Sequence, residues 1–162
     1  MKLGLISDTH DHLPRTRQAL DRFVAAGVER VLHAGDICSP FVFFEFRQRK
    51  LAFTAVFGNN DGEWLWLVKL AKDLGEMKKG PIAFELAGKR IALMHEPVFL
   101  EALADSGHFD LIVCGHTHEP LVERRGQAVI LNPGEACGYL KDRATAMICD
   151  LDTMSVETIA LE

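Results

Sequence analysis

The fold class is decided by residues 2–36, KLGLISDTHDHLPRTRQALDRFVAAGVERVLHAGD. Apolar runs at 2–6 and 30–33 each predict a short buried strand. Between them, residues 14–26 begin with proline, carry apolar side chains at helical spacing and are followed by Gly27, a common helix stop. Strand, helix and strand in this order predict two parallel strands joined by a crossover helix, the unit of an α/β sheet.

The same alternation continues along the first half of the chain. Ser39 and Pro40 have the pattern of an N-cap followed by proline at the first helical position, which predicts a helix to about residue 50. A strand is predicted at 51–57 and a helix at 63–74, ended by Gly75.

The second half is richer in strands and contains one predicted helix, at 98–106. Its strands are predicted at 82–86, 90–94, 110–114, 121–123, 128–131, 144–150 and 155–161. We therefore expect an α/β fold in which two sheets pack face to face, with helices covering the outside.

The composition excludes several classes of protein. The chain is 48% hydrophobic and 25% charged, as in ordinary globular proteins, and it has neither a signal-peptide stretch nor a run long enough to span a bilayer. Its net charge of −5 and its short, scattered basic clusters make long nucleic acid an unfavoured partner. The four cysteines are widely spaced and form no C-x-x-C pair, and Cys114 and Cys149 lie in strand-like runs. This predicts buried free thiols rather than disulfides or zinc ligands, and hence a cytoplasmic protein.

Polar residues able to bind a metal directly follow five of the predicted strands. Ligands of α/β sheets bind beyond the carboxyl ends of the strands, so these five loops are expected to converge on one crevice. Together they supply two carboxylates, one amide oxygen and four of the chain's seven imidazoles, from Asp8, His10, Asp36, Asn59, His95, His116 and His118. Among the remaining histidines, His33 is expected to be structural.

Each loop taken alone has an ordinary explanation. Asp8 and His10 could cap the following helix, and Gly35-Asp36 is a common turn pair. Residues 59–62 have a strong turn composition, and His95 could simply close a strand. Taken together these explanations fail, because five strand ends would have to acquire metal-binding chemistry independently.

The order of these motifs, D-x-H, G-D, G-N-x-D, H and G-H-x-H, resembles the signature of the calcineurin-like metallophosphoesterases. The short chain is most similar to the small prokaryotic phosphodiesterase branch, and Asn132-Pro133-Gly134 extends the resemblance along nearly the whole sequence. The resemblance implies a four-layer α-β-β-α sandwich of two mixed β-sheets flanked by helices, in a single domain over residues 1–162.

The resemblance also implies a site for two divalent transition-metal ions. Asp36 is expected to bridge them. Asp8, His10 and His118 would complete the first ion's ligands; Asn59, His95 and His116 would complete the second's. Mixed imidazole, carboxylate and amide ligation suits Mn, Fe, Co, Ni or Zn; manganese is the expected ion, and the other four stay open. Such a pair of ions would hydrolyse the phosphodiester bond of a small substrate by attack of a metal-bridging hydroxide.

The chain departs from the family pattern at three positions. Many members carry histidine after G-N, where it protonates the leaving group; here the residue is Asn60, which cannot act as a general acid. We expect Asn60 to contact a phosphate oxygen instead. Glu96 stands where glycine is usual and is expected to reshape the rim of the pocket; Glu135 stands where serine often follows Asn-Pro-Gly and has no predicted role.

Two other functions remain open. The retromer subunit of this family keeps the fold and serves chiefly as a binding platform, so the chain could be a non-catalytic metal-binding scaffold. A nucleotide phosphatase or nuclease of the same chemistry is the other alternative. The aromatic-rich predicted helices also suggest a homo-oligomer interface, through Phe41, Phe43, Phe44, Phe46, Trp64, Leu65, Trp66 and Leu67.

Overall fold

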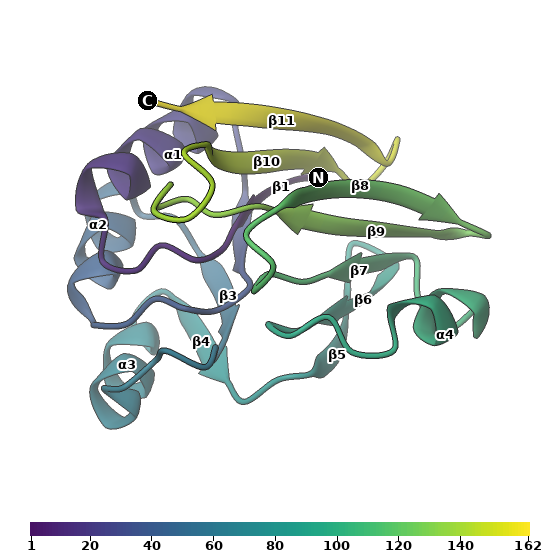
Figure 1. Cartoon of the computed structure of the whole chain (residues 1–162), viewed down its shortest axis with the longest axis horizontal. Helices are drawn as coiled ribbons and strands as arrows, with labels where there is room; N and C mark the ends of the chain where they lie inside the picture. The colour runs from purple at the N-terminus through teal and green to yellow at the C-terminus, as the bar shows by residue number, and fades with distance from the viewer.

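Two sheets carry all the strands of the computed structural model, which describes residues 1–162 (Figure 1). The six-stranded sheet has the order β11 (Ser155–Leu161), β10 (Ala144–Asp150), β1 (Lys2–Ile6), β2 (Arg30–His33), β3 (Phe53–Val56) and β4 (Gly75–Lys78). The five-stranded sheet has the order β5 (Ile82–Leu86), β6 (Lys89–Leu93), β7 (Leu111–Val113), β9 (Ala128–Pro133) and β8 (Pro120–Arg125). The helices are α1 (Leu13–Ala25), α2 (Phe41–Arg49), α3 (Trp64–Ala71) and α4 (Leu100–Asp105).

Both sheets are mixed, as predicted. In the first, β1 to β4 are parallel neighbours, while β10 and β11 are antiparallel to their neighbours. In the second, β6, β7 and β9 are parallel, and the edge strands β5 and β8 run antiparallel. The predicted ligands follow the carboxyl ends of five of these parallel strands, β1, β2, β3, β6 and β7.

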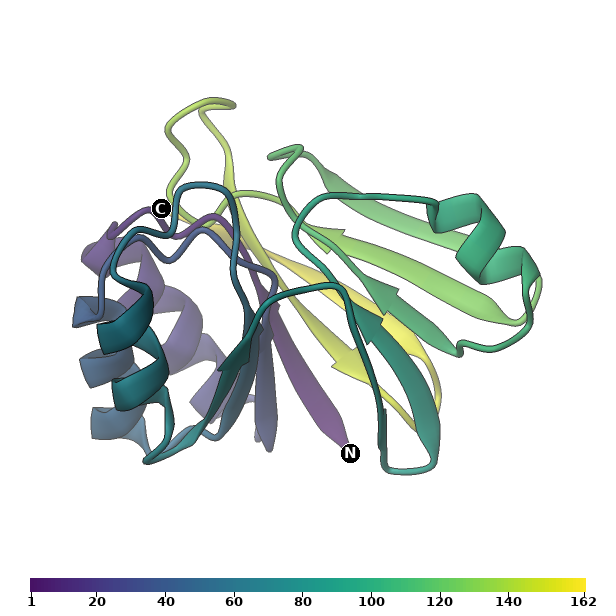
Figure 2. The same ribbon diagram turned by 90° about the horizontal axis from the view of Figure 1, so that it is seen from below.

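Alternate residues of β1 are buried in two different cores. Leu3 and Leu5 pack between the two sheets with residues such as Val113 of β7. Ile6, pointing the other way, joins a core shared with Phe23 of α1 and with α2 and α3. A third core lies between the five-stranded sheet and α4. Three cores separate four layers, which confirms the predicted α-β-β-α sandwich (Figure 2).

The helix predicted at 63–74 is shorter than expected, and a strand follows it. Helix α3 ends at Ala71, and Gly75 begins strand β4 instead of ending a helix. A Cβ atom at Gly75 would lie 1.9 Å from the carbonyl oxygen of Phe53, so glycine is required by close strand pairing. The sequence signal for β4 was weak because this edge strand buries only Met77.

Two helix starts also differ from prediction. Pro40, not Ser39, is the N-cap of α2, and the Ser39 hydroxyl donates to Asp11 Oδ1 at 2.7 Å. The helix predicted at 98–106 is α4, which begins only at Leu100, because Phe99 adopts a left-handed conformation with φ of 54°.

The aromatic-rich helices α2 and α3 are only partly buried. Phe43, Phe46 and Leu67 lie in the core, whereas the other five residues of the predicted interface, Phe41, Phe44, Trp64, Leu65 and Trp66, are exposed. None of the helices has the length and apolar character needed to cross a membrane. All four cysteines are free, and the predicted burial of Cys114 and Cys149 is confirmed.

Candidate metal centre

The loops that carry the seven predicted ligands lie at one end of the two sheets (Figure 2). Because β1, β2 and β3 are parallel neighbours, Asp8, Asp36 and Asn59 follow them at the same edge. Strands β6 and β7 are parallel neighbours in the other sheet and carry His95 and the turn 115–118 at their ends. The structure therefore brings together all seven residues.

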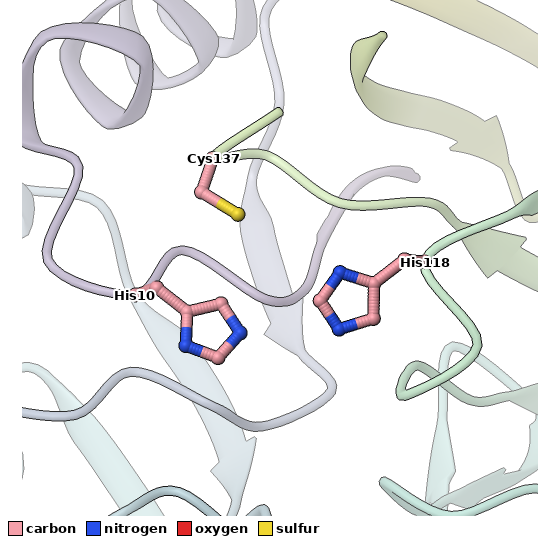
Figure 3. Close-up of side chains that lie close together, drawn as sticks. All are labelled: His10, His118 and Cys137. Carbon is pink, nitrogen blue, oxygen red and sulfur yellow. The ribbon is translucent and has the colours of Figure 1, made fainter. Parts of the chain in front are cut away.

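Four of them form a first cluster. His118 Nε2 lies 3.4 Å from Asp8 Oδ1, and His10 Nε2 lies 4.0 Å from the same oxygen. His10 Nε2 is also 3.6 Å from Asp36 Oδ2. The two imidazoles stack with their ring centres 5.6 Å apart (Figure 3). The four side chains, Asp8, His10, Asp36 and His118, thus direct two nitrogens and two oxygens at one point.

A second cluster begins at the same oxygen of Asp36. His95 Nε2 lies 3.4 Å from Asp36 Oδ2 and 2.9 Å from Asn59 Oδ1. His116 Nδ1 is 2.9 Å from Asn59 Oδ1 and 3.3 Å from His95 Nε2. Asp36 is therefore common to both clusters, the position that the sequence predicts for a bridging carboxylate.

The backbone at these positions is strained. Five of the seven residues have a positive φ: Asp8 (51°), His10 (41°), Asp36 (56°), His116 (68°) and His118 (61°). A residue other than glycine costs on the order of 1–3 kcal/mol in such a conformation, and strain of this kind gathers at functional sites. The fold holds these loops in the geometry that aims the side chains inward.

Two atoms of the first cluster are buried without a hydrogen-bond partner: Asp8 Oδ1 and His10 Nε2. An unsatisfied buried polar atom costs roughly 1–3 kcal/mol. Since both atoms point at the same place as His118 Nε2, a single cation there would satisfy them together. The donor set therefore fits a metal ion, and nitrogen with carboxylate oxygen is the chemistry that divalent transition metals accept.

Hydrogen bonds favour the ionised form of the shared carboxylate, Asp36. Burial on its own would raise the pKa of Asp36, but hydrogen bonds from His95 and from the backbone and side chain of Asn60 hold that pKa well below its usual range. By contrast, burial raises the pKa of Asp8. The Nδ1–H of His95 donates to the carbonyl of Ala34 at 2.8 Å, which leaves its Nε2 directed at Asp36.

Two buried polar side chains hold the loops in place. The Asp61 carboxylate accepts hydrogen bonds from the backbone N–H of Gly58 and of Cys38, both at 2.7 Å. Asn132 Nδ2 donates to the carbonyl of Gly115 at 2.8 Å, at the start of the turn that carries His116 and His118. Both belong to motifs quoted for the family resemblance, and their observed contacts are structural.

Glu135 is a member of the site that the sequence pattern did not identify. It is fully buried, and its Oε2 accepts the Nδ1–H of His118 at 2.7 Å. Its carboxylate also accepts the backbone N–H of Leu140 at 3.0 Å and of Lys141 at 2.6 Å. No local signal could have found it, because the histidine that it contacts lies on another loop.

Cys137 points toward the gap between His10 and His118, within 4.8 Å of their nitrogens (Figure 3). Metal binding needs the thiolate, but burial raises the pKa of Cys137 to about 12. Its Sγ–H donates to Glu135 Oε2 at 3.4 Å. In the absence of a metal ion the thiol is therefore protonated, and it lies beside the first cluster.

Asn60 lies against the shared carboxylate. Its backbone N–H donates to Asp36 Oδ1, and its Nδ2 donates to Asp36 Oδ2, both at 2.8 Å. Its side chain is exposed at the rim of the first cluster, beside His10 and His118. The phosphate contact expected of Asn60 stays a prediction.

Comparisons with known proteins identify the family of the chain. The family model described as a calcineurin-like phosphoesterase superfamily domain matches residues 1–154. Phosphodiesterase MJ0936 of Methanocaldococcus jannaschii is 39% identical over 166 aligned positions that cover 100% of both chains. Phosphodiesterase YfcE of Escherichia coli is 30% identical over 149 positions, covering 83% of this chain and 78% of its own.

A solved archaeal phosphodiesterase is similar over 99% of this chain and 100% of its own, with a TM-score of 0.93 and 37% identity. These similarities confirm the predicted resemblance to small prokaryotic phosphodiesterases. On the family match and the full-length relative together, the chain belongs to the calcineurin-like phosphoesterase superfamily.

Proposed function

We propose that this protein is a phosphodiesterase that acts on small substrates and depends on two divalent metal ions. The observation that carries the proposal is the first cluster, where Asp8 Oδ1 and His10 Nε2 are buried, convergent and without a hydrogen-bond partner. A protein that bound no metal ion would gain nothing from keeping such costly atoms unsatisfied. The full-length similarity to a phosphodiesterase supports the same activity.

The residues of each cluster would hold one ion. Asp8, His10 and His118 serve the first, and Asn59, His95 and His116 serve the second. Asp36 Oδ2, 3.6 Å from His10 Nε2 and 3.4 Å from His95 Nε2, would be the ligand that the two ions share. Two such ions, when bound, neutralise phosphate charge and lower the pKa of a water molecule. We propose manganese as the native metal, with Fe, Co, Ni and Zn as the other ions that this ligand set accepts.

Asn60 then positions the shared carboxylate and the substrate. Two hydrogen bonds from Asn60 hold both oxygens of Asp36 in place. The second hydrogen on Asn60 Nδ2 is available to donate to a phosphate oxygen at the rim. An amide has no proton acidic enough to protonate a leaving group, so diesters with acidic leaving groups should react best.

The test is a metal and substrate survey. Purified protein is analysed for bound metals and assayed on phosphodiesters and phosphomonoesters with Mn, Co, Ni and Zn. We expect diester hydrolysis that needs metal and that Asp36→Asn abolishes. Preference for nucleotide monoesters would favour the nucleotide phosphatase. Turnover no greater than that of Asp36→Asn, with metal still bound, would instead favour a scaffold.

The exposed apolar residues of α2 and α3 support a homo-oligomer as a further proposal. Leu65 is 90% exposed, and Phe41 and Trp66 are each more than half exposed. Burying such side chains against a second copy would remove them from water. Light scattering of wild type and Leu65→Asp tests this, with loss of a dimer expected in the variant. We also propose a cytoplasmic location, because free thiols persist in reducing compartments.

A further inference from the structure

A hollow of about 210 Å³ adjoins the second cluster. Asn59 and His95 form the side nearest the cluster. The remaining walls are mainly apolar and aromatic and come from the loops after β3, β4 and β6. We call this hollow the aromatic pocket, lined by Phe57, Trp64, Lys79, Pro81, Met94 and Val98.

Trp64 is held in a fixed position although it is 45% exposed. Its indole stacks on Phe57, with ring centres 4.4 Å apart and planes 15° from parallel. Its Nε1–H donates to the carbonyl of Asp61 at 2.5 Å. Asp61 belongs to the loop that also presents Asn59, so the indole is anchored to a metal-ligand loop. An aromatic ring that is already immobilised loses little conformational entropy when a ligand stacks on it.

The charge of the pocket favours a neutral group. Lys79 and Glu96 contribute one charge of each sign to its rim. Their charges cancel, so the rim does not select for a second phosphate. Apolar walls disfavour a sugar, whose hydroxyl groups would lose their hydrogen bonds to water. A neutral planar ring suits both the rim, which has no net charge, and the apolar walls.

The volume sets the size of that ring. A cavity of about 150 Å³ holds benzene, so the aromatic pocket is large enough for one six-membered ring with substituents. The ring would lie beside His95 and Asn59, two residues of the second cluster.

We propose that the aromatic pocket binds a single-ring aromatic substituent of the phosphodiester, either a phenyl-type ring or a pyrimidine base. The inference rests on the proposed phosphodiesterase function and names the class of substrate for that site. Trp64 is then a specificity-determining residue.

The chain provides a matched pair of probes, because it has two tryptophans. Trp66 is 53% exposed on the same helix and does not line the pocket. In a Trp66→Leu variant, all tryptophan fluorescence comes from Trp64; in Trp64→Leu, all of it comes from Trp66. Each manganese-loaded variant is titrated with dimethyl phosphate, methyl phenyl phosphate and the methyl ester of thymidine 5′-phosphate.

We expect at least one of the ring-bearing diesters to change Trp64 emission at a concentration about 5-fold or more below that needed for dimethyl phosphate, since aromatic stacking is worth this much or more. The emission of Trp66 should not respond. Tighter binding of the thymidine diester would indicate a nucleotide substrate. Tighter binding of methyl phenyl phosphate would indicate a non-nucleotide substrate. Equal affinity for all three diesters, or an equal response of Trp66, would overturn the proposal. The readout needs no turnover, so it is independent of the activity test above.

Discussion

His118 Nδ1 lies 2.7 Å from Glu135 Oε2, while Nε2 of the same ring lies 3.4 Å from Asp8 Oδ1. The carboxylate therefore keeps a proton on Nδ1 and leaves Nε2 free to act as a ligand. Glu135 is itself anchored by the backbone of Leu140 and Lys141. The orientation of His118 thus depends on a buried residue two loops away from it.

Replacing Glu135 should weaken metal binding. Glu135→Gln keeps an acceptor for Nδ1–H but removes the negative charge, and changes of this kind typically lower metal affinity about 10- to 100-fold. Calorimetric metal titration measures the effect, and Glu135→Ala should lose more. Glu123→Gln, an exposed change on β8, is the control. Unchanged affinity in Glu135→Ala would refute the positioning role.

A methyl group at Gly58 should disturb the shared carboxylate. A Cβ atom there would lie 2.2 Å from Asp36 Oδ1 and 2.5 Å from its backbone nitrogen. Gly58→Ala is therefore expected to lower the free energy of unfolding by roughly 1–3 kcal/mol and to reduce bound metal. Gly62→Ala, on the same loop with open space around it, should behave as wild type. Chemical denaturation and metal analysis compare the two; equal behaviour would contradict the expectation.

His33 should make the metal-free protein less stable in acid. It is fully buried; its Nδ1 accepts the N–H of Gly35 at 3.2 Å, and its Nε2 lies 3.2 Å from Thr9 Oγ1, which confirms its predicted structural role. Burial lowers the pKa of His33 from 6.5 to about 3. Between these values the unfolded chain holds a proton that the folded chain does not. The free energy of unfolding should therefore fall as pH drops from about 6.5 toward 3, by at most ~1.4 kcal/mol per pH unit from this residue.

Denaturant titrations in EDTA at several pH values measure that contribution. At pH 7, His33→Gln should have a lower free energy of unfolding than wild type. Between pH 6.5 and 3, its free energy of unfolding should change with pH less steeply than that of wild type, by the contribution of about one proton. His108→Gln, at an exposed loop position, should keep the wild-type slope. If the slopes of His33→Gln and wild type coincide, the buried neutral imidazole is not responsible.

Introducing a general acid at Asn60 should change the leaving-group dependence. Asn60 already lies against Asp36 and at the rim of the first cluster. In Asn60→His, an imidazole at this position could protonate the departing oxygen. We expect a gain of about 100-fold on diesters with alkoxide leaving groups and little gain on nitrophenyl diesters. Rates across a series of leaving groups test this, with Asn60→Ala as the control. A uniform change along the series would argue against the assignment.

The sequence by itself determined the secondary structure that presents the site. The spacing of apolar residues identified β1, α1 and β2, because an element that is buried on one face has apolar side chains at regular intervals along the sequence. Parallel strands of one sheet must end at the same edge, so the convergence of Asp8, Asp36 and Asn59 followed from local pattern and topology.

Only the tertiary structure decided which other residues complete the site. Strand β4 buries one residue at a sheet edge, so its pattern was too weak to distinguish it from the end of a helix. The contact of Glu135 with His118 and the anchoring of Trp64 beside Asn59 join residues from different loops. Such contacts leave no local periodicity, because they depend on how both sheets and their loops pack together.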